Sequence, residues 1–349
     1  MTPGCATPQG CSRFVSRFLP LQTAGFYRDA QGLQVSTLGL GSYLGQMNQA
    51  VDDGYRSSVV IAVESGLNFI DTSLNYRHQR SERAIGAALR ELFGSGRAQR
   101  DEIVICTKAG FLIPHAVPES LKPDDVVAGM HSMAPAFLAD QLERSRNNLG
   151  LECIDVLYLH NPETELEHVS RDEFQNRIRN AFTYMEEAVV SGFIRFYGTA
   201  TWDGYRRGPN APPGLSLDEI VAAADVVAGS GHHFRFIQLP FNLAMPEAYT
   251  LRRDDVNVLD TAAKYGITVV ASASLLQSRL ARNLPADLAN QLSGLTTDAA
   301  RALQFTRSTP GITVALAGMS NPAHVRENLE IAGIPPLSAS EYNALYRQA

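Results

Sequence analysis

The sequence predicts an α/β fold, a single-domain (β/α)8 TIM barrel in which eight parallel strands are each followed by a helix. Short runs rich in β-branched and aromatic residues alternate eight times with amphipathic helical stretches, and this alternation is typical of parallel sheets. Eight such units favour closure into a barrel. The alternative is an open doubly wound sheet, but the GxGxxG sequence expected after its first strand is absent.

The predicted strands cover, in chain order, residues 36–41, 67–72, 102–108, 154–160, 194–200, 234–240, 266–272 and 311–318. The predicted helices that follow them cover residues 54–66, 81–93, 134–149, 171–190, 216–228, 254–265, 296–307 and 322–331. Gly150 directly follows the third helix, where glycine is the usual terminating residue. Because no linker interrupts the series, we expect an N-terminal extension at residues 1–24, packed as an arm on one barrel domain at residues 25–349.

Composition narrows the class of function. The formal net charge of -6 argues against nucleic acid as a partner, because nucleic-acid-binding proteins present a basic face. No window of about 18 apolar residues is present, so we expect no membrane span. The four cysteines form no CxxC pair, and a reducing cytoplasm is the simplest compartment. Adjacent His232 and His233 would point to opposite faces of a strand, so we predict no metal site. The oligomeric state is left open.

Polar residues stand at the ends of consecutive predicted strands. Asp71, Lys108 and His160 end the second, third and fourth strands, Gln238 lies near the end of the sixth, and Tyr76 follows the second. Each alone has an ordinary structural explanation, such as a turn former, a solvated lysine or a packed ring. Because barrel chemistry sits at the carboxyl ends of strands, their convergence on one mouth indicates a single site.

The chemistry of this group follows from how its members pair. A phenol has a pKa of about 10 and is a poor acid near neutrality. The ammonium of Lys108 would lower the pKa of Tyr76, Asp71 would hold that ammonium in place, and an imidazole could bind a substrate oxygen. Such a set suits protonation of an oxygen while hydride arrives at its carbon, with Tyr76 as the acid.

Four segments resemble the aldo/keto reductase superfamily, in order and at suitable spacing. They are FIDTSLNY (69–76), ICTKAG (105–110), LYLHNPE (157–163) and ALAGMSNPAHVRENL (315–329), and the resemblance extends over residues 33–332. It implies an NAD(P)H-dependent barrel acting on a small carbonyl compound. It also implies a catalytic tetrad, which falls on Asp71, Tyr76, Lys108 and His160.

The resemblance also implies a binding track for NADP(H), with NAD(H) as the other candidate. The implied cofactor-binding residues are Gly41, Ser42, Tyr43, Thr201, Gln238, Ser272, Leu275, Gly318, Ser320, Asn321, His324, Glu327 and Asn328. The chain departs from the family at three places along this track. Ala200 precedes Thr201 where a serine is usual, Ser272 replaces a ring-stacking tyrosine, and Met319 and His324 replace the cations that bind the 2′-phosphate.

Two rival functions remain open at this point. One is a non-catalytic, cofactor-binding or regulatory barrel of the same fold, which the altered cofactor positions allow. The other is a Schiff-base lyase that uses Lys108 at its strand end. Segments expected around the mouth contain residues that either shape a substrate pocket or merely pack, namely Phe111, His115, Met133, Trp202, Tyr205 and Met245.

Overall fold

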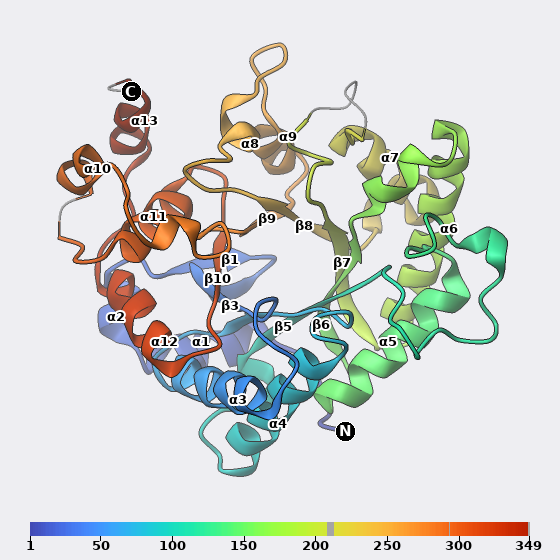
Figure 1. Cartoon of the computed structure of the whole chain (residues 1–349), viewed down its shortest axis with the longest axis horizontal. Coiled ribbons are helices and arrows are strands. Elements are labelled where there is room, and N and C mark those ends of the chain that lie inside the picture. Colours follow the sequence, from blue (N-terminus) through green and yellow to red (C-terminus); the bar gives the residue numbers. More distant parts are fainter. Residues whose placement is uncertain (208–212, 293, 348–349) are drawn as a thin grey trace.

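The computed structural model describes residues 1–207, 213–292 and 294–347. Eight parallel strands close into a barrel in the order β10-β3-β4-β5-β6-β7-β8-β9 (Figure 1). Their bounds are β3 Leu38–Gly41, β4 Phe69–Asp71, β5 Val104–Ala109, β6 Ile154–His160, β7 Ile194–Ala200, β8 Phe234–Pro240, β9 Thr268–Ser272 and β10 Val314–Gly318. The predicted fold class is therefore confirmed, with each strand inside or close to its predicted range.

Helices surround the barrel and carry the chain from one strand to the next (Figure 1). The connecting helices are α3 Gln49–Glu64, α4 Arg80–Gly94, α5 Pro135–Leu149, α6 Arg171–Val190, α7 Leu217–Ala228, α9 Val258–Lys264, α11 Asp298–Ser308 and α12 Pro322–Asn328. Additional helices are α1 Pro8–Ser16, α2 Leu19–Thr23, α8 Glu247–Thr250, α10 Ala286–Gln291 and α13 Ala339–Arg347.

The predicted start of the first connecting helix at residue 54 was wrong. The helix α3 begins at Gln49, because the side chain of Asn48 accepts a hydrogen bond from the Val51 N–H and caps the helix. As predicted, Gly150 ends α5, in the left-handed conformation at φ 72°.

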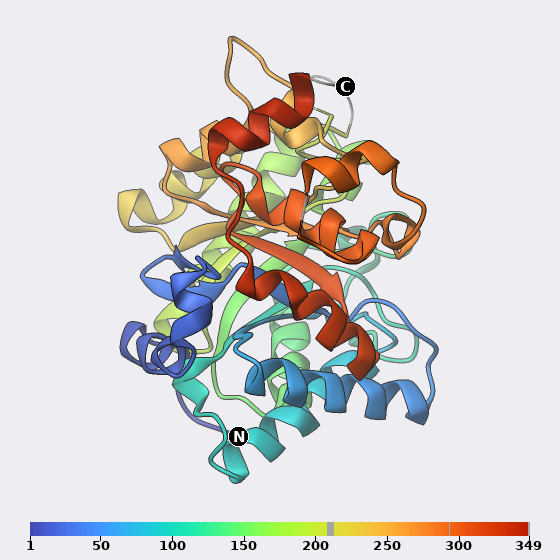
Figure 2. The ribbon, with the colours of Figure 1, turned by 90° about the vertical axis from the view of Figure 1, so that its left-hand side faces the viewer.

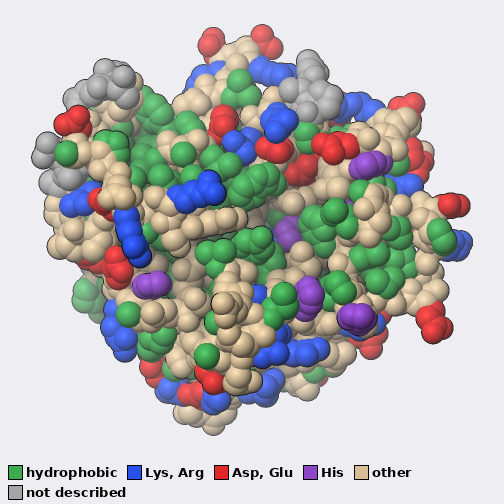
Figure 3. Space-filling view, in the orientation of Figure 1, with side chains coloured by type: hydrophobic (Ala, Val, Ile, Leu, Met, Phe, Trp, Pro, Cys, Tyr) green, Lys and Arg blue, Asp and Glu red, His purple; other side chains and the backbone are tan. Residues whose placement is uncertain are grey.

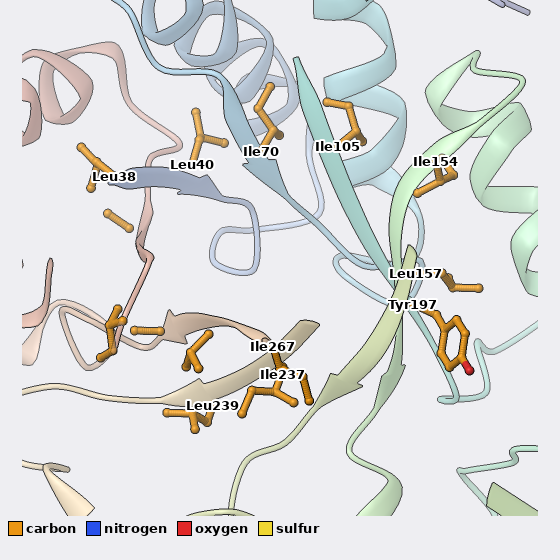
Figure 4. Packing of buried hydrophobic residues seen from close by; sticks show 14 of the residues in the cluster. Leu38, Leu40, Ile70, Ile105, Ile154, Leu157, Tyr197, Ile237, Leu239 and Ile267 are labelled. Carbon is orange, nitrogen blue, oxygen red and sulfur yellow. The ribbon is translucent and has the colours of Figure 1, made fainter. Parts of the chain in front are cut away.

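Alternation along each strand separates two apolar layers. Leu40, Ile70 and Ile105 point outward to the surrounding helices (Figure 4). Their neighbours Phe69, Val104 and Cys106 belong instead to the cluster inside the barrel. Because side chains alternate with a period of two, the polar residues at positions 71 and 108 share the inward face.

A β-hairpin that the sequence analysis did not predict fills the N-terminal end of the barrel. Strands β1 Tyr27–Ala30 and β2 Leu33–Ser36 pair in antiparallel fashion, and Leu33 and Val35 pack against the inner cluster. The turn places Gln31 and Gly32 at φ 57° and 79°, as a two-residue hairpin turn requires. The perpendicular view shows the N-terminal helices and this hairpin gathered on one side of the barrel (Figure 2).

The N-terminal segment is anchored to the barrel through a buried carboxylate. Asp155 Oδ1 accepts a hydrogen bond from the Ala6 N–H at 2.6 Å, and Oδ2 accepts from the Ile105 N–H at 2.7 Å. Arg100 Nη2 donates to the same Oδ2 at 2.8 Å. Both Asp155 and Arg100 are buried, so this pair joins the arm to β5 and β6 without contact with solvent. In the described part of the chain, no helix is long and apolar enough to cross a membrane.

We expect Asp155→Ala to destabilise the fold by about 3–5 kcal/mol, because it leaves the Arg100 charge buried without its partner. Urea unfolding monitored by circular dichroism measures this difference. Asp140→Ala is the matched control, since it breaks the more exposed Arg144–Asp140 pair of α5, and such pairs contribute only about 0.3–0.5 kcal/mol. Equal losses in the two variants would contradict the role assigned to Asp155.

Candidate functional site

The strand register brings four polar side chains into the carboxyl end of the barrel. Asp71 lies opposite Cys106, and Lys108 is two residues farther along the same face of β5. Lys108 lies opposite Tyr158, and His160 is again two residues farther on. This offset between neighbouring strands follows from the tilt of the strands in a barrel. It places Asp71, Lys108 and His160 at successively higher levels around the barrel interior.

A cavity of about 390 Å³ opens above these side chains. The face seen in Figure 3 is hollowed near its middle, and hydrophobic side chains flank the hollow. Sequence-selected residues that line the cavity are Gly41, Ser42, Tyr43, Asp71, Tyr76, His160, Thr201, Gln238, Ser272, Leu275 and Gly318. Lys108 lies beneath the cavity and is almost fully buried.

Asp71 and Lys108 form a buried ion pair under the cavity. Lys108 Nζ donates to Asp71 Oδ1 at 2.5 Å and to the Thr72 carbonyl oxygen at 2.8 Å. Gln238 Nε2 donates to the other oxygen of Asp71 at 2.8 Å. Burial acts to lower the pKa of Lys108, but Asp71 and Tyr76 together outweigh it and raise the pKa above its usual value. The lysine is therefore an ammonium at neutral pH.

Tyr76 reaches the ion pair from the loop after β4. Lys108 Nζ lies 4.8 Å from the centre of the Tyr76 ring, and Tyr43 packs edge-on against that ring at 5.0 Å. Burial raises the pKa of Tyr76, and Lys108 opposes this shift without cancelling it. Lys108 thus acts on the phenol in the predicted direction, but desolvation of the phenolate exceeds the attraction of the ammonium, and the net pKa of Tyr76 is raised.

His160 stands beside Tyr76 as a neutral imidazole. Its ring lies 5.8 Å from that of Tyr76 and 4.9 Å from that of Phe111, edge-on to both. Its Nδ1 is 3.2 Å from the Ser73 Oγ. Burial and the Lys108 charge hold the pKa of His160 well below its usual range. The ring can therefore exchange hydrogen bonds with a ligand without carrying charge.

The cofactor residues implied by the resemblance fall into two groups. One group lines the cavity with the tetrad, and within it the Thr201 N–H donates to the Gln238 carbonyl oxygen at 2.8 Å. The other group lies outside the cavity lining, on the turn after β10 and on α12, and comprises Ser320, Asn321, His324, Glu327 and Asn328. Asn321 caps α12 by accepting from the Ala323 N–H at 2.9 Å.

Two positions on this turn differ in exposure. Met319 is fully buried, whereas His324 is exposed on α12. Arg326 is also exposed, and its guanidinium donates back to the Pro322 carbonyl oxygen. A charged ligand at the start of α12 would therefore meet His324 and Arg326 from the solvent side.

Several lining residues were not singled out from the sequence. Asn75, Asn161, Ser274, Gln277 and Ser278 line the cavity. Asn161 directly follows the fourth strand and has φ 49°, so its place next to a strand end was an available signal. Ser274, Gln277 and Ser278 follow β9, where the resemblance had singled out only Ser272 and Leu275. Of the aromatic residues left undecided, Phe111 and Trp202 line the cavity, whereas Tyr205 is buried and its hydroxyl is bonded to Thr199.

Comparison with known proteins identifies relatives along nearly the whole chain. The sequence profile of the aldo/keto reductase family matches residues 37–347. A relative from Pseudomonas sp. named D-threo-aldose 1-dehydrogenase is 26% identical over 337 residues, covering 87% of this chain and 92% of the relative. An Arabidopsis thaliana relative named as a probable voltage-gated potassium channel subunit beta is 24% identical over 322 residues, covering 88% and 90%.

Solved structures share the same architecture. An aldo/keto reductase from Klebsiella pneumoniae in complex with NADP and acetate gives a TM-score of 0.64 at 22% identity, covering 91% of this chain and 93% of the other. The holo form of an aldo-keto reductase from Bacillus halodurans gives a TM-score of 0.66 at 20% identity, covering 93% and 96%. At these identities the likeness shows a shared fold.

We expect Lys108→Met to destabilise the protein by about 3–5 kcal/mol near neutral pH, because it leaves the Asp71 carboxylate buried without its ammonium. Burial raises the pKa of Asp71, and Lys108 opposes that shift. A folded-state pKa above the unfolded value stabilises the fold at acid pH, and that stabilisation is lost as pH rises through the folded pKa. The loss in Lys108→Met should therefore be larger at about pH 8 than at about pH 4.

Urea unfolding at both pH values measures this dependence. The double variant Asp71→Asn, Lys108→Met is the control, because it removes the buried carboxylate together with its partner. It should be more stable than Lys108→Met at the higher pH. A single variant whose loss does not change with pH would show that Asp71 bears no uncompensated charge.

Proposed function

Because this chain belongs to the aldo/keto reductase family, we propose that it reduces an aldehyde or ketone to an alcohol with NADPH, using Tyr76 as the proton donor. It is an oxidoreductase of that family. The observation that carries the proposal is the Lys108–Asp71 ion pair directly beneath the Tyr76 ring, on the floor of the cavity. In this arrangement the Tyr76 phenol would face a substrate in the cavity, and the Lys108 ammonium is held behind the ring.

A nicotinamide cofactor held in this cavity would supply the hydride, and the side chains of this protein would supply the proton. As negative charge develops on the substrate oxygen, the Tyr76 hydroxyl gives its proton to that oxygen. The resulting phenolate is stabilised by Lys108, whose charge Asp71 maintains. The raised pKa of free Tyr76 keeps the phenol protonated until that moment, so the acid is present in its useful form at neutral pH.

His160 would bind the substrate oxygen together with Tyr76. Its ring lies edge-on to Tyr76 and lines the same cavity. Because the ring is neutral, it contributes a hydrogen bond without repelling the Lys108 ammonium, and with Tyr76 it defines where the reacting oxygen sits. Phe111 and Trp202 line the cavity beside it and favour an apolar group on the substrate.

The residues present fit a nicotinamide cofactor. Gln238 donates its Nε2 to Asp71, which leaves its oxygen as the end of the amide that can accept from a carboxamide. Gly41 and Gly318 line the cavity together with Ser42, so the chain presents backbone and small polar groups to a bulky ligand. Solved relatives of the same fold hold NADP, which supports NADP(H) here.

Both rival functions meet a physical objection. A Schiff base requires a neutral amine, but Asp71 raises the pKa of Lys108 and keeps it protonated. The Arabidopsis thaliana relative named as a channel subunit leaves a regulatory barrel possible in this family. The presence of all four tetrad residues at one cavity favours catalysis over that alternative.

We expect Tyr76→Phe to lower turnover by about 10²–10⁴-fold while cofactor binding remains nearly unchanged. The substitution removes the proton donor and keeps the ring that packs against Tyr43 and His160. Turnover is followed by NADPH absorbance across a panel of carbonyl compounds, and binding by fluorescence. Tyr43→Phe is the control, because its hydroxyl has no assigned proton transfer. If Tyr76→Phe reduces a good substrate at the parent rate, Tyr76 is not the proton donor.

We expect His324→Ala to weaken the binding of NADP(H) and to leave that of NAD(H) nearly unchanged, because an imidazole N–H can donate to the 2′-phosphate that only NADP(H) carries. The position on α12 that holds an arginine in many family members is His324, and the neighbouring cation position is the buried Met319. Titration of both cofactors into the parent and into His324→Ala tests this. An NADP(H) affinity insensitive to the substitution would assign the 2′-phosphate to Arg326 instead.

A further inference from the structure

The long segment between β5 and α5 contacts the carboxyl end of β6 through a buried histidine. His131 is fully buried, although it lies far from any strand end in the sequence. The segment folds back on itself, with Leu112 N–H donating to the Met130 carbonyl oxygen and Ser132 N–H donating to the Gly110 carbonyl oxygen. The base of this excursion thus places His131 beside the end of β6.

His131 connects His160 to a buried carboxylate. Its Nε2 is 2.8 Å from the backbone carbonyl oxygen of His160, and its Nδ1 is 3.1 Å from Glu165 Oε1. Glu165 is itself fully buried, on the 3-10 turn Pro162–Glu167, and its second oxygen accepts from Arg177 Nη1 at 3.0 Å. The chain of contacts runs from α6 to the backbone of the tetrad histidine.

The partners of His131 fix the orientation of its ring. A carbonyl oxygen can only accept a hydrogen bond, so Nε2 donates to His160. Nδ1 faces Glu165 Oε1, and Arg177 donates to the other oxygen of that carboxyl group. Both ring nitrogens are therefore engaged, and the ring cannot turn without breaking a contact.

Gly110 leaves the space that this bond requires. A Cβ at residue 110 would lie 2.8 Å from His131 Nε2 and 3.1 Å from the His160 carbonyl oxygen. Any larger residue would push the two groups apart. Gly110 also has φ 144°, which side-chain-bearing residues rarely adopt. The lack of a side chain at residue 110 and its backbone conformation thus both accommodate the His131–His160 contact.

The same cluster fixes the orientation of the His160 ring. Phe111 packs edge-on against His131 at 5.2 Å and against His160 at 4.9 Å. On its other side the His160 ring faces Tyr76. Because Phe111 also lines the cavity, a shift of His131 would move one wall of the cavity together with the imidazole.

We propose that His131, held by Glu165, is a positioning residue that sets the place of His160 opposite Tyr76 through the His160 backbone carbonyl and Phe111. This inference rests on the proposed function, in which His160 orients the substrate oxygen. It assigns no contact with substrate to His131. It adds to the tetrad a support that comes from the β5–α5 segment, outside the four matching motifs.

The same support has an electrostatic consequence for His160. The titratable and charged groups arranged around the His160 ring are Lys108, Tyr76 and His131, with Asp71 behind Lys108 and Glu165 and Arg177 behind His131. Burial, Lys108 and His131 all lower the pKa of His160, in that order. Replacing His131 by an amide should therefore raise the pKa of His160.

The test compares two polar replacements of His131. In His131→Gln the amide nitrogen reaches the position of Nε2 and can still donate to the His160 carbonyl, whereas the shorter His131→Asn cannot. We expect kcat to fall by about 10–100-fold in His131→Asn, with cofactor affinity unchanged, and to recover in large part in His131→Gln. The control is His233→Asn, which breaks a second His–Glu pair, with Glu186, at the start of β8. It should match the parent.

A second readout does not require turnover. Imidazole resonances followed by NMR report the titration of His160, assigned with His160→Asn, and this titration should move to higher pH in both His131 variants. Gly110→Ala, which crowds Nε2, provides an independent variant should His131→Asn not fold. Parent turnover in His131→Asn, or equal losses in Asn and Gln, would overturn the positioning role. A parent that reduces no carbonyl compound would overturn the proposed function, and an unmoved His160 titration would refute the His131–His160 coupling separately.

Discussion

The Asp71–Lys108 pair is the interaction around which the site is built. Two opposite charges are buried inside the barrel, where an unpaired charge is strongly unfavourable. Each therefore fixes the other, and Gln238 and the Thr72 carbonyl fill the remaining hydrogen-bonding positions. The ammonium is held where it can stabilise a phenolate, and nothing else in the site needs to carry charge.

The balance of charge explains the state of the two neighbouring rings. Burial favours neutral Tyr76 and neutral His160, and the Lys108 charge lowers the pKa of both the phenol and the imidazole. For the phenol this favours proton release, and for the imidazole it disfavours proton uptake. In the proposed mechanism, one fixed cation thus favours proton release from Tyr76 and keeps His160 uncharged.

Much of this arrangement could be predicted from residue order. Strand runs that end in Asp71, Lys108 and His160 lead to one mouth once the fold is a barrel, because parallel strands end at the same side. The catalytic and cofactor roles of these residues stay predictions. The hairpin turn at Gln31–Gly32 was missed because it lacks the usual Asn-Gly pair. The net shift of the Tyr76 pKa depends on burial, which no motif reports.

His131 shows a different limit of sequence reasoning. It lies near the end of the long segment between β5 and α5, which has no periodic pattern, and only the folded chain brings it to the His160 carbonyl. The motif ICTKAG contains Gly110, but the reason for a glycine there became apparent only from the structure, in which the His131 ring lies against it. Contacts made by loops across the mouth are long-range, and spacing along the chain does not encode them.

The hairpin of β1 and β2 determines from which end of the barrel a ligand can enter. It fills the N-terminal end of the barrel with Leu33 and Val35, so the cavity is approached from the side of the strand carboxyl ends. Two ligands bound together in this cavity would therefore enter and leave through the same opening. In the proposed reaction, the ligand bound deeper in the barrel would therefore have to bind first and leave last.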